Sequence, residues 1–253
     1  MVWFKRKYII YLVVLTIFTW WSMNMTNFEI RNFANFGNAV DIVVNRFFPI
    51  EWSLFPRLLQ ASLVTLAVAF LGSFFALIIA VPLSFMAAHN TSRHPVFYGL
   101  TRTSLSGLRS VPEIVFGLIL VAALGLGPFP AVLAILLHNI GVLGKLISEL
   151  IESADPGPQE AMKTVGATGW VAVLFSILPQ IWPNVLSHYF YRFEVAIRTS
   201  LILGFIGGGG LGQLLFNHFS SFYYTAVALD IIMIMALVII VDFIGGYVRK
   251  RVI

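Results

Sequence analysis

Long apolar stretches, repeated along the chain, set the strongest constraint on its fold. Residues 58–88 carry no Asp, Glu, Lys or Arg, and about 20 mostly apolar residues are enough to cross a bilayer as a helix. At about 1.5 Å per residue this stretch would reach roughly 46 Å, so it must tilt or protrude. A soluble core could not bury a chain that is 59% hydrophobic and 11% charged, because soluble domains carry about 25% charged residues.

Six such stretches predict an all-α, polytopic membrane protein. They cover residues 8–23, 58–88, 111–126, 129–151, 181–205 and 224–248. The first could belong to a signal peptide, but it ends in Trp20 and Trp21 rather than in small residues, so we expect an uncleaved span. We expect residues 1–56 to form this span and an outer interfacial segment, and residues 57–253 to form one membrane domain.

The basic residues indicate the orientation. Six spans place both termini on one side, and the basic clusters all fall there, which predicts that this side is cytoplasmic in a multi-pass protein of the cell (inner) membrane. These residues are Lys5, Arg6, Lys7, Arg93, Arg102, Arg109, Arg249, Lys250 and Arg251. The net charge of +5 therefore reflects lipid-facing anchors, and we expect no nucleic-acid partner.

Several kinds of chemistry are excluded. The chain has no cysteine, so it forms no disulfide, thiolate nucleophile or zinc–thiolate site. The run GGGGLG at 207–212 lacks the lysine and Ser/Thr of a nucleotide-binding P-loop. An intramembrane enzyme is an alternative, but His138, Ser148 and Glu149 lie in no nucleophile motif or metal-binding spacing. We therefore expect a protein that is not an enzyme, with no catalytic residue, metal site or cofactor of its own.

A polar, glycine-marked stretch, EAMKTVGATGWVAVLFSILPQ, interrupts this apolar chain at 160–180. Its pattern resembles the EAA motif of ABC importer permeases, which are the inner-membrane components of binding-protein-dependent transport, although Met162 and Ser176 depart from the usual residues. The resemblance implies a type I (MetI-like) fold over residues 57–253 and a cytoplasmic coupling helix near 155–170, roughly from 158 to 165. The residues expected to couple to the ATPase are Glu160, Ala161, Lys163, Gly166, Leu178 and Pro179.

The same resemblance implies the partners. A second copy of the chain would complete the path, two ABC ATPase subunits using ATP and Mg²⁺ would grip the coupling helices, and an extracytoplasmic binding protein would deliver the solute. We expect Gly166 to allow a turn and Pro179 to stand in the first turn of the next helix.

A second motif points to the solute. YRFEVAIRTSLILGFIGGGGLG at 191–212 and RSVPE at 109–113 resemble the phosphonate importer permeases, which implies transport of phosphonate or a related phosphorus oxyanion. Phosphate, phosphite and methionine-like amino acids are the alternatives within this class. A channel or scaffold subunit is a further alternative, although it would have no use for a coupling segment.

Charged residues within a span are candidates for function because they are costly there. Glu194 and Arg198 are four residues apart and can pair on one face, whereas Arg192 points away from them. Arg192, with Arg198, could line an anion path, since arginine suits phosphorus oxyanions. Alternatively, Arg192 pairs with another helix through Glu113 or Asp230.

The other polar residues in the spans have similar alternatives. Arg109 and Glu113 could pair with each other or border an inner gate on the path. His138 and Asn139 are expected to be a buried, hydrogen-bonded pair, and Asp242 is expected to meet lipid headgroups or Arg249.

Six glycines occur within the nine residues 204–212. Such a run ends a helix and permits close packing or bending, so it forms either a plain outer turn or the hinge of an outer gate. The expected hinge residues are Gly204, Gly207, Gly209, Gly210 and Gly212.

Overall fold

The computed structural model describes residues 6–31, 36–92 and 94–252, and it divides into two units, residues 1–49 and 50–253. In the first unit, α1 (Arg6–Met25) buries none of its side chains, and α2 (Phe36–Asp41) leads into a short π-helical turn, Ile42–Arg46. The relevant architecture lies in the second unit.

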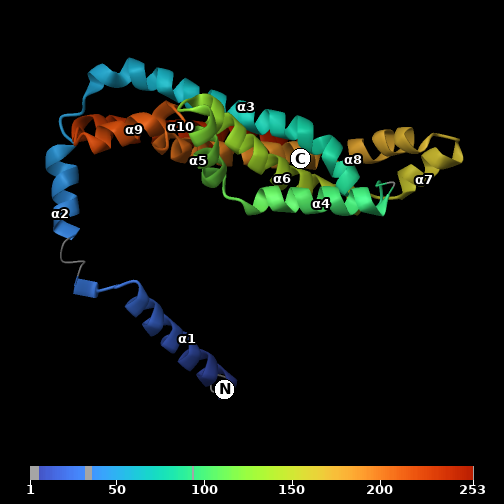
Figure 1. The fold of residues 1–253 in the computed structure, drawn as a ribbon, viewed down its shortest axis with the longest axis horizontal. Helices are drawn as coiled ribbons and strands as arrows, with labels where there is room; N and C mark the ends of the chain where they lie inside the picture. The colour runs from blue at the N-terminus through green and yellow to red at the C-terminus, as the bar shows by residue number, and fades with distance from the viewer. Residues whose placement is uncertain (1–5, 32–35, 93, 253) are drawn as a thin grey trace. The chain divides into compact units, whose positions relative to one another are not determined.

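The second unit is a helical bundle (Figure 1). After a 3₁₀ turn (Trp52–Leu54), its helices are α3 (Phe55–Ala87), α4 (Pro95–Ser110), α5 (Glu113–Leu124), α6 (Pro128–Ser153), α7 (Gly157–Thr164), α8 (Gly169–Phe205), α9 (Gly210–Ser220) and α10 (Tyr224–Val252). Helix α6 is central, because it packs against α3, α4, α5 and α8. Helix α7 lies at one end of this bundle, whereas α9 and the start of α10 lie at the other.

The all-α membrane prediction is confirmed, with differences in the spans. Five helices or helix pairs among the described residues are long and apolar enough to cross a membrane, and the pair α4–α5 makes a sixth if it is one bent span. The predicted span 111–126 is wrong as a single crossing: α5 has 12 residues and meets α4 at 86°. Twelve residues reach only about 18 Å, less than the roughly 30 Å of hydrocarbon.

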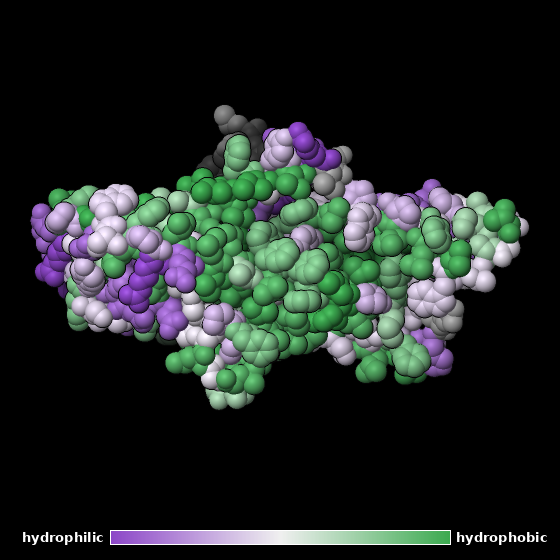
Figure 2. Space-filling model, turned by 90° about the horizontal axis from the view of Figure 1, so that it is seen from above, coloured by the Kyte–Doolittle hydropathy of each residue, from purple (hydrophilic) through white to green (hydrophobic). Residues whose placement is uncertain are grey.

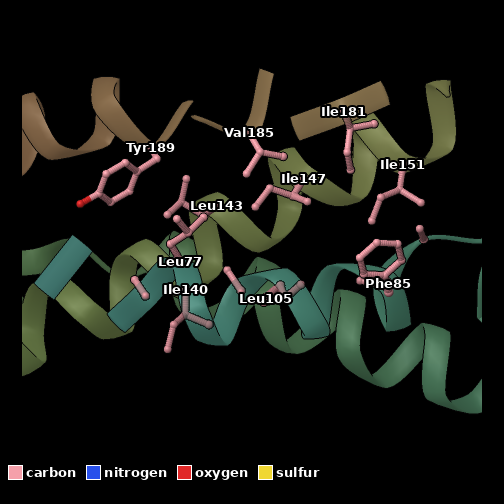
Figure 3. Packing of buried hydrophobic residues seen from close by; sticks show 14 of the residues in the cluster. Leu77, Phe85, Leu105, Ile140, Leu143, Ile147, Ile151, Ile181, Val185 and Tyr189 are labelled. Atoms are coloured by element: carbon pink, nitrogen blue, oxygen red, sulfur yellow. The ribbon is translucent and has the colours of Figure 1, made fainter. Parts of the chain in front are cut away.

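Helix α8 also differs from its prediction. It begins at Gly169 rather than near residue 181, so Pro179 lies inside the helix, together with Pro183, and not in its first turn. An internal proline is tolerated in a membrane helix when neighbouring helices hold it. Figure 3 shows the packing that does so: Ile181 and Val185 of α8 lie against Ile147 of α6 and are almost fully buried.

The outside of the bundle is apolar as well. Large hydrophobic side chains such as Ile78 on α3 and Phe243 on α10 are more than half exposed. Figure 2 shows hydrophobic residues over the middle of the molecule and polar residues toward its ends. Because water would penalise so large an apolar surface, this band is where lipid or another protein covers the bundle.

Candidate functional site

Helix α7 is a short, exposed, polar helix at one end of the bundle. None of its side chains is buried, as expected for a docking helix, and its bounds agree with the expected 158–165 to within a residue. Glu160 stands in its first turn and Lys163 in its last, which is the favourable arrangement for the helix dipole. Ala161 is exposed beside them.

The segment before α7 is tied to α8. The Gln180 side chain accepts a hydrogen bond from the Asp155 backbone N–H at 3.1 Å and donates one to the Asp155 carbonyl at 3.3 Å. The Asp155 carboxylate in turn accepts from the Gly157 N–H at 2.9 Å. These hydrogen bonds fix the segment before α7 to helix α8.

Gly166 forms the turn that follows the end of α7. Its φ is +83°, a left-handed conformation that glycine adopts freely and other L-residues adopt at a cost. The turn is closed by hydrogen bonds from the Gly166 N–H to the Lys163 carbonyl at 3.0 Å and from the Ala167 N–H to the Met162 carbonyl at 3.1 Å. Leu178 lies further along α8, partly buried against the core.

Arg192 is the centre of a polar network between three helices. Its guanidinium donates to the Asn139 side-chain oxygen at 2.5 and 2.8 Å and lies 3.3 Å from the Glu113 carboxylate. His138 contacts the same Glu113 oxygen at 3.3 Å and, through Nδ1, the Val111 carbonyl at 2.9 Å. The network therefore joins α8 and α6 to the bend between α4 and α5.

This network shows which partners its members have in this conformation. Arg192 does pair with Glu113, and His138 and Asn139 form part of one hydrogen-bonded cluster, as expected. The predicted pair between Arg109 and Glu113 is wrong, because Glu113 is engaged by Arg192 and His138 while Arg109 is exposed. The Arg109 backbone instead packs on α6, where a Cβ added at Gly141 would lie 2.5 Å from the Arg109 nitrogen.

Two further ion pairs join α8 to α10. Glu194 meets Arg249 at 2.6 Å, and Arg198 donates to both oxygens of Asp242 at 2.9 Å. The predicted pair between Glu194 and Arg198 is therefore wrong, and Asp242 pairs with Arg198 rather than with Arg249. The physical reason is that Asp242 and Arg249 are seven residues apart on one face of α10 and offer each α8 charge an opposite partner. Gly245 lies between them and leaves room for the Glu194 carboxylate.

We expect the Arg192 network to contribute strongly to stability. Arg192→Gln should lower the free energy of unfolding by about 3 kcal/mol, since removing one partner of a buried ion pair strands the other. The Arg192 side chain is 11% exposed and that of Glu113 22%. Thermal unfolding in detergent should show a midpoint lower by roughly 6–12 °C.

Arg198→Gln is the matched control. The Arg198 and Asp242 side chains are 49% and 44% exposed, and exposed ion pairs contribute about 1 kcal/mol or less. Equal shifts for the two variants would show that the Arg192 network is no more important than a surface pair.

The glycine run interrupts a long helix. Helix α8 ends at Phe205 and α9 begins at Gly210, and the two together form one candidate span from Gly169 to Ser220. Three glycines, Gly207, Gly209 and Gly210, have φ between +71° and +95°. The run is therefore where the chain turns from α8 into α9, whose Gly212 and Gln213 pack against Leu201 and Gly204 near the end of α8.

Close backbone packing holds this break together. A Cβ at Gly212 would lie 2.0 Å from the Leu201 carbonyl oxygen, and one at Gly204 would lie 2.7 Å from the Gln213 nitrogen. The Gly207 carbonyl accepts a hydrogen bond at 2.8 Å from the N–H of Gly127, in the turn between α5 and α6. The break is thus bonded to the neighbouring helical hairpin.

Sequence reasoning named Asp230 only as a possible partner of Arg192 and missed its contact with His218 of α9. His218 Nδ1 lies 2.7 Å from the fully buried Asp230 carboxylate, whose other oxygen has no hydrogen-bond partner among the described residues. The signal was available, since a charged residue such as Asp230 within an apolar stretch needs a partner. No group of three His, Asp or Glu side chains suited to a metal ion occurs in residues 6–31, 36–92 and 94–252.

Comparison with known proteins agrees with this geometry. The phosphite transport system permease protein PtxC of Stutzerimonas stutzeri is 38% identical over 203 residues, covering 80% of this chain and 74% of that protein. The phosphate-import permease protein PhnE of Mycolicibacterium smegmatis is 34% identical over 196 residues, covering 78% of this chain but 37% of that protein.

The fold has a solved counterpart. A chain of the MetNI methionine ABC transporter in an inward-facing conformation matches with a TM-score of 0.69 at 18% identity, over 81% of this chain and 100% of that chain. At this identity the likeness concerns the fold alone. The family model for the binding-protein-dependent transport system inner membrane component matches residues 80–253. Because this match spans well over half of the sequence, the chain belongs to the family of inner-membrane components of binding-protein-dependent transport systems.

Proposed function

We propose that the chain is the permease subunit of an ABC importer for a phosphorus oxyanion. The observation that carries this proposal is α7, an exposed polar helix fixed to α8 at the end of an apolar bundle, in a chain of this family. The relatives named for phosphite and phosphate transport support the solute class. They support phosphite and phosphate at least as well as phosphonate.

The proposed assembly uses the exposed surfaces of the bundle. Its membrane bundle has an exposed apolar surface for lipid and a second copy, and α7 for an ATPase subunit that uses ATP and Mg²⁺. A binding protein would deliver the solute at the opposite end, where α9 and the start of α10 lie. The α7 end would then face the cytoplasm, with both chain termini on that side, and this chain would catalyse no reaction of its own.

The mechanism would use the rigid connections described above. Closure of the ATPase pair would move α7, and the Gln180–Asp155 hydrogen bonds would pass this movement to α8. Helix α8 carries the Arg192 network and ends at the glycine break, which would act as the gate hinge. The interhelical ion pairs would then have to rearrange as the path opens.

The charges expected along the path have a defined role in this proposal. Arg192 and Arg198 each hold a carboxylate of another helix, so their guanidinium groups are occupied in this conformation. An opening motion that separates α5 from α8 would release Arg192 toward a passing anion. Glu113 and Glu194 would then limit how tightly the anion is held.

Reconstitution tests the proposed function. The chain should co-purify with its ATPase and, in liposomes with the binding protein, should support ATP-dependent uptake of phosphate or phosphite. Glu160→Ala combined with Gly166→Ala should reduce both assembly and uptake, because the two changes alter the charge and the end of α7. Normal assembly and ATP hydrolysis by the double variant would contradict the coupling role.

A further inference from the structure

A small polar groove lies between α3 and α9. It has a volume of about 360 Å³ and is lined by one face of each helix, at residues three or four apart. Four of its eight lining residues, Arg57, Gln60, Gln213 and Asn217, have side chains that donate hydrogen bonds, and none of the eight is acidic. The volume falls within the range of small-molecule sites, about 300–1,000 Å³.

Two larger grooves among the described residues differ in character. The one of about 740 Å³ lies between α3 and α8 and is lined mainly by apolar side chains such as Phe74 and Trp182, and the one of about 460 Å³ is mainly apolar too but is also lined by Phe97 of α4. They suit acyl chains or another helix. The α3–α9 groove alone of these three combines a cation with several amides, which is the donor set that an oxyanion needs.

The cation in the groove is available for a ligand. Arg57 is exposed and makes no hydrogen bond or ion pair with another described residue. Its charge acts through space on Asp230, but that carboxylate is fully buried and hydrogen-bonded to His218. The Asp230 side chain is not part of the groove lining and makes no ion pair with the Arg57 guanidinium.

The groove also adjoins the glycine break. Gly210 lines it, and the Leu211 N–H donates to the Thr65 hydroxyl at 3.0 Å, which fixes the start of α9 against α3. The start of α3 and helix α9 both lie at the end of the bundle that is opposite α7. An anion held by Arg57 would therefore stand directly beside the proposed gate hinge, at the end where solute arrives.

We infer that the α3–α9 groove is a transient oxyanion subsite at the outer mouth of the path. Arg57 supplies a permanent positive charge with a planar donor fork, and the amides of Gln60, Gln213 and Asn217 supply neutral donors. Because the guanidinium is exposed to water, binding is weak, as transport requires. This inference rests on the proposed function, since the ligand class is that of the proposed solute.

Uptake by the reconstituted complex tests the subsite. Arg57→Gln should lower ATP-dependent uptake of inorganic phosphate and phosphite at least fivefold at saturating binding protein, and Arg57→Lys should give an intermediate rate. Gln60→Glu, which places a negative charge in the groove with little change of shape, should reduce uptake at least as much. Lys250→Gln removes the same charge from an exposed position on α10 and should leave uptake unchanged.

The outcomes separate the alternatives. If Arg57→Gln and Gln60→Glu both keep uptake within twofold of the unmodified chain, the subsite is refuted. If Arg57→Gln lowers uptake only below saturating binding protein and reaches the unmodified rate at saturation, Arg57 contacts that protein and the subsite is likewise refuted. If the unmodified complex hydrolyses ATP but takes up neither anion, the proposed function fails before the subsite is reached.

Discussion

Gly166→Ala should lower ATP-driven uptake about tenfold without unfolding the chain. At φ +83° an alanine is strained by about 1–2 kcal/mol, and about 1.4 kcal/mol corresponds to a factor of ten in an equilibrium. Relief of this strain would redirect the end of α7, and thereby the surface proposed to bind the ATPase. Uptake per reconstituted complex and the amount of co-purified ATPase are the measurements.

Two matched variants isolate the cause. Gly169→Ala is the control, because an added Cβ meets no atom within 4 Å at either position and only Gly166 has positive φ. Gly166→Asn should recover much of the uptake, since asparagine tolerates the left-handed region. The backbone explanation is wrong if Gly166→Ala and Gly169→Ala behave alike.

Gly212→Ala should destabilise the protein by about 3 kcal/mol or more. Its Cβ would lie 2.0 Å from the Leu201 carbonyl oxygen and 2.8 Å from the Leu201 carbonyl carbon. Overpacking typically costs about 1–3 kcal/mol, and here backbone rather than a side-chain tip must move. We expect less folded protein in detergent and an unfolding midpoint lower by roughly 6–12 °C.

Two further variants test this expectation. One changes the other glycine of the same contact, and the other changes a distant glycine. Gly204→Ala should behave like Gly212→Ala, because its Cβ would meet the backbone of Gln213 at 2.7 Å. Gly246→Ala on α10 should be neutral or slightly stabilising, since nothing lies within 4 Å. An unchanged midpoint for both crowded positions would mean that α8 and α9 do not pack closely in solution.

Local chemistry made much of the fold predictable. Apolar length predicts membrane helices, and the glycine in the polar stretch predicts the turn at Gly166, whereas α7 itself was expected from the resemblance to the EAA motif. The glycine run predicts a break, because no other residue accepts such φ values so cheaply. These features depend on residues that are neighbours in the sequence.

The partners of the ion pairs were harder to predict from the sequence. Glu194 and Arg198 satisfy the spacing rule for a helical pair, yet each binds a residue of α10 more than 40 positions away. The choice depends on which helix lies alongside α8. The α4–α5 bend escaped prediction for a similar reason, since Val111 and Glu113 are held by His138 and Arg192 from other helices.

The two prolines inside α8 make this helix easier to bend at one place than elsewhere along its length. Pro179 and Pro183 are four residues apart on one face, and each removes a backbone hydrogen bond to the carbonyl four residues before it. Two backbone hydrogen bonds are thus absent on the same side of the helix, near α7. In the proposed mechanism, a push from α7 would bend α8 at this joint first, while the segment beyond Pro183, which carries Arg192, Glu194 and Arg198, would move as a stiff rod.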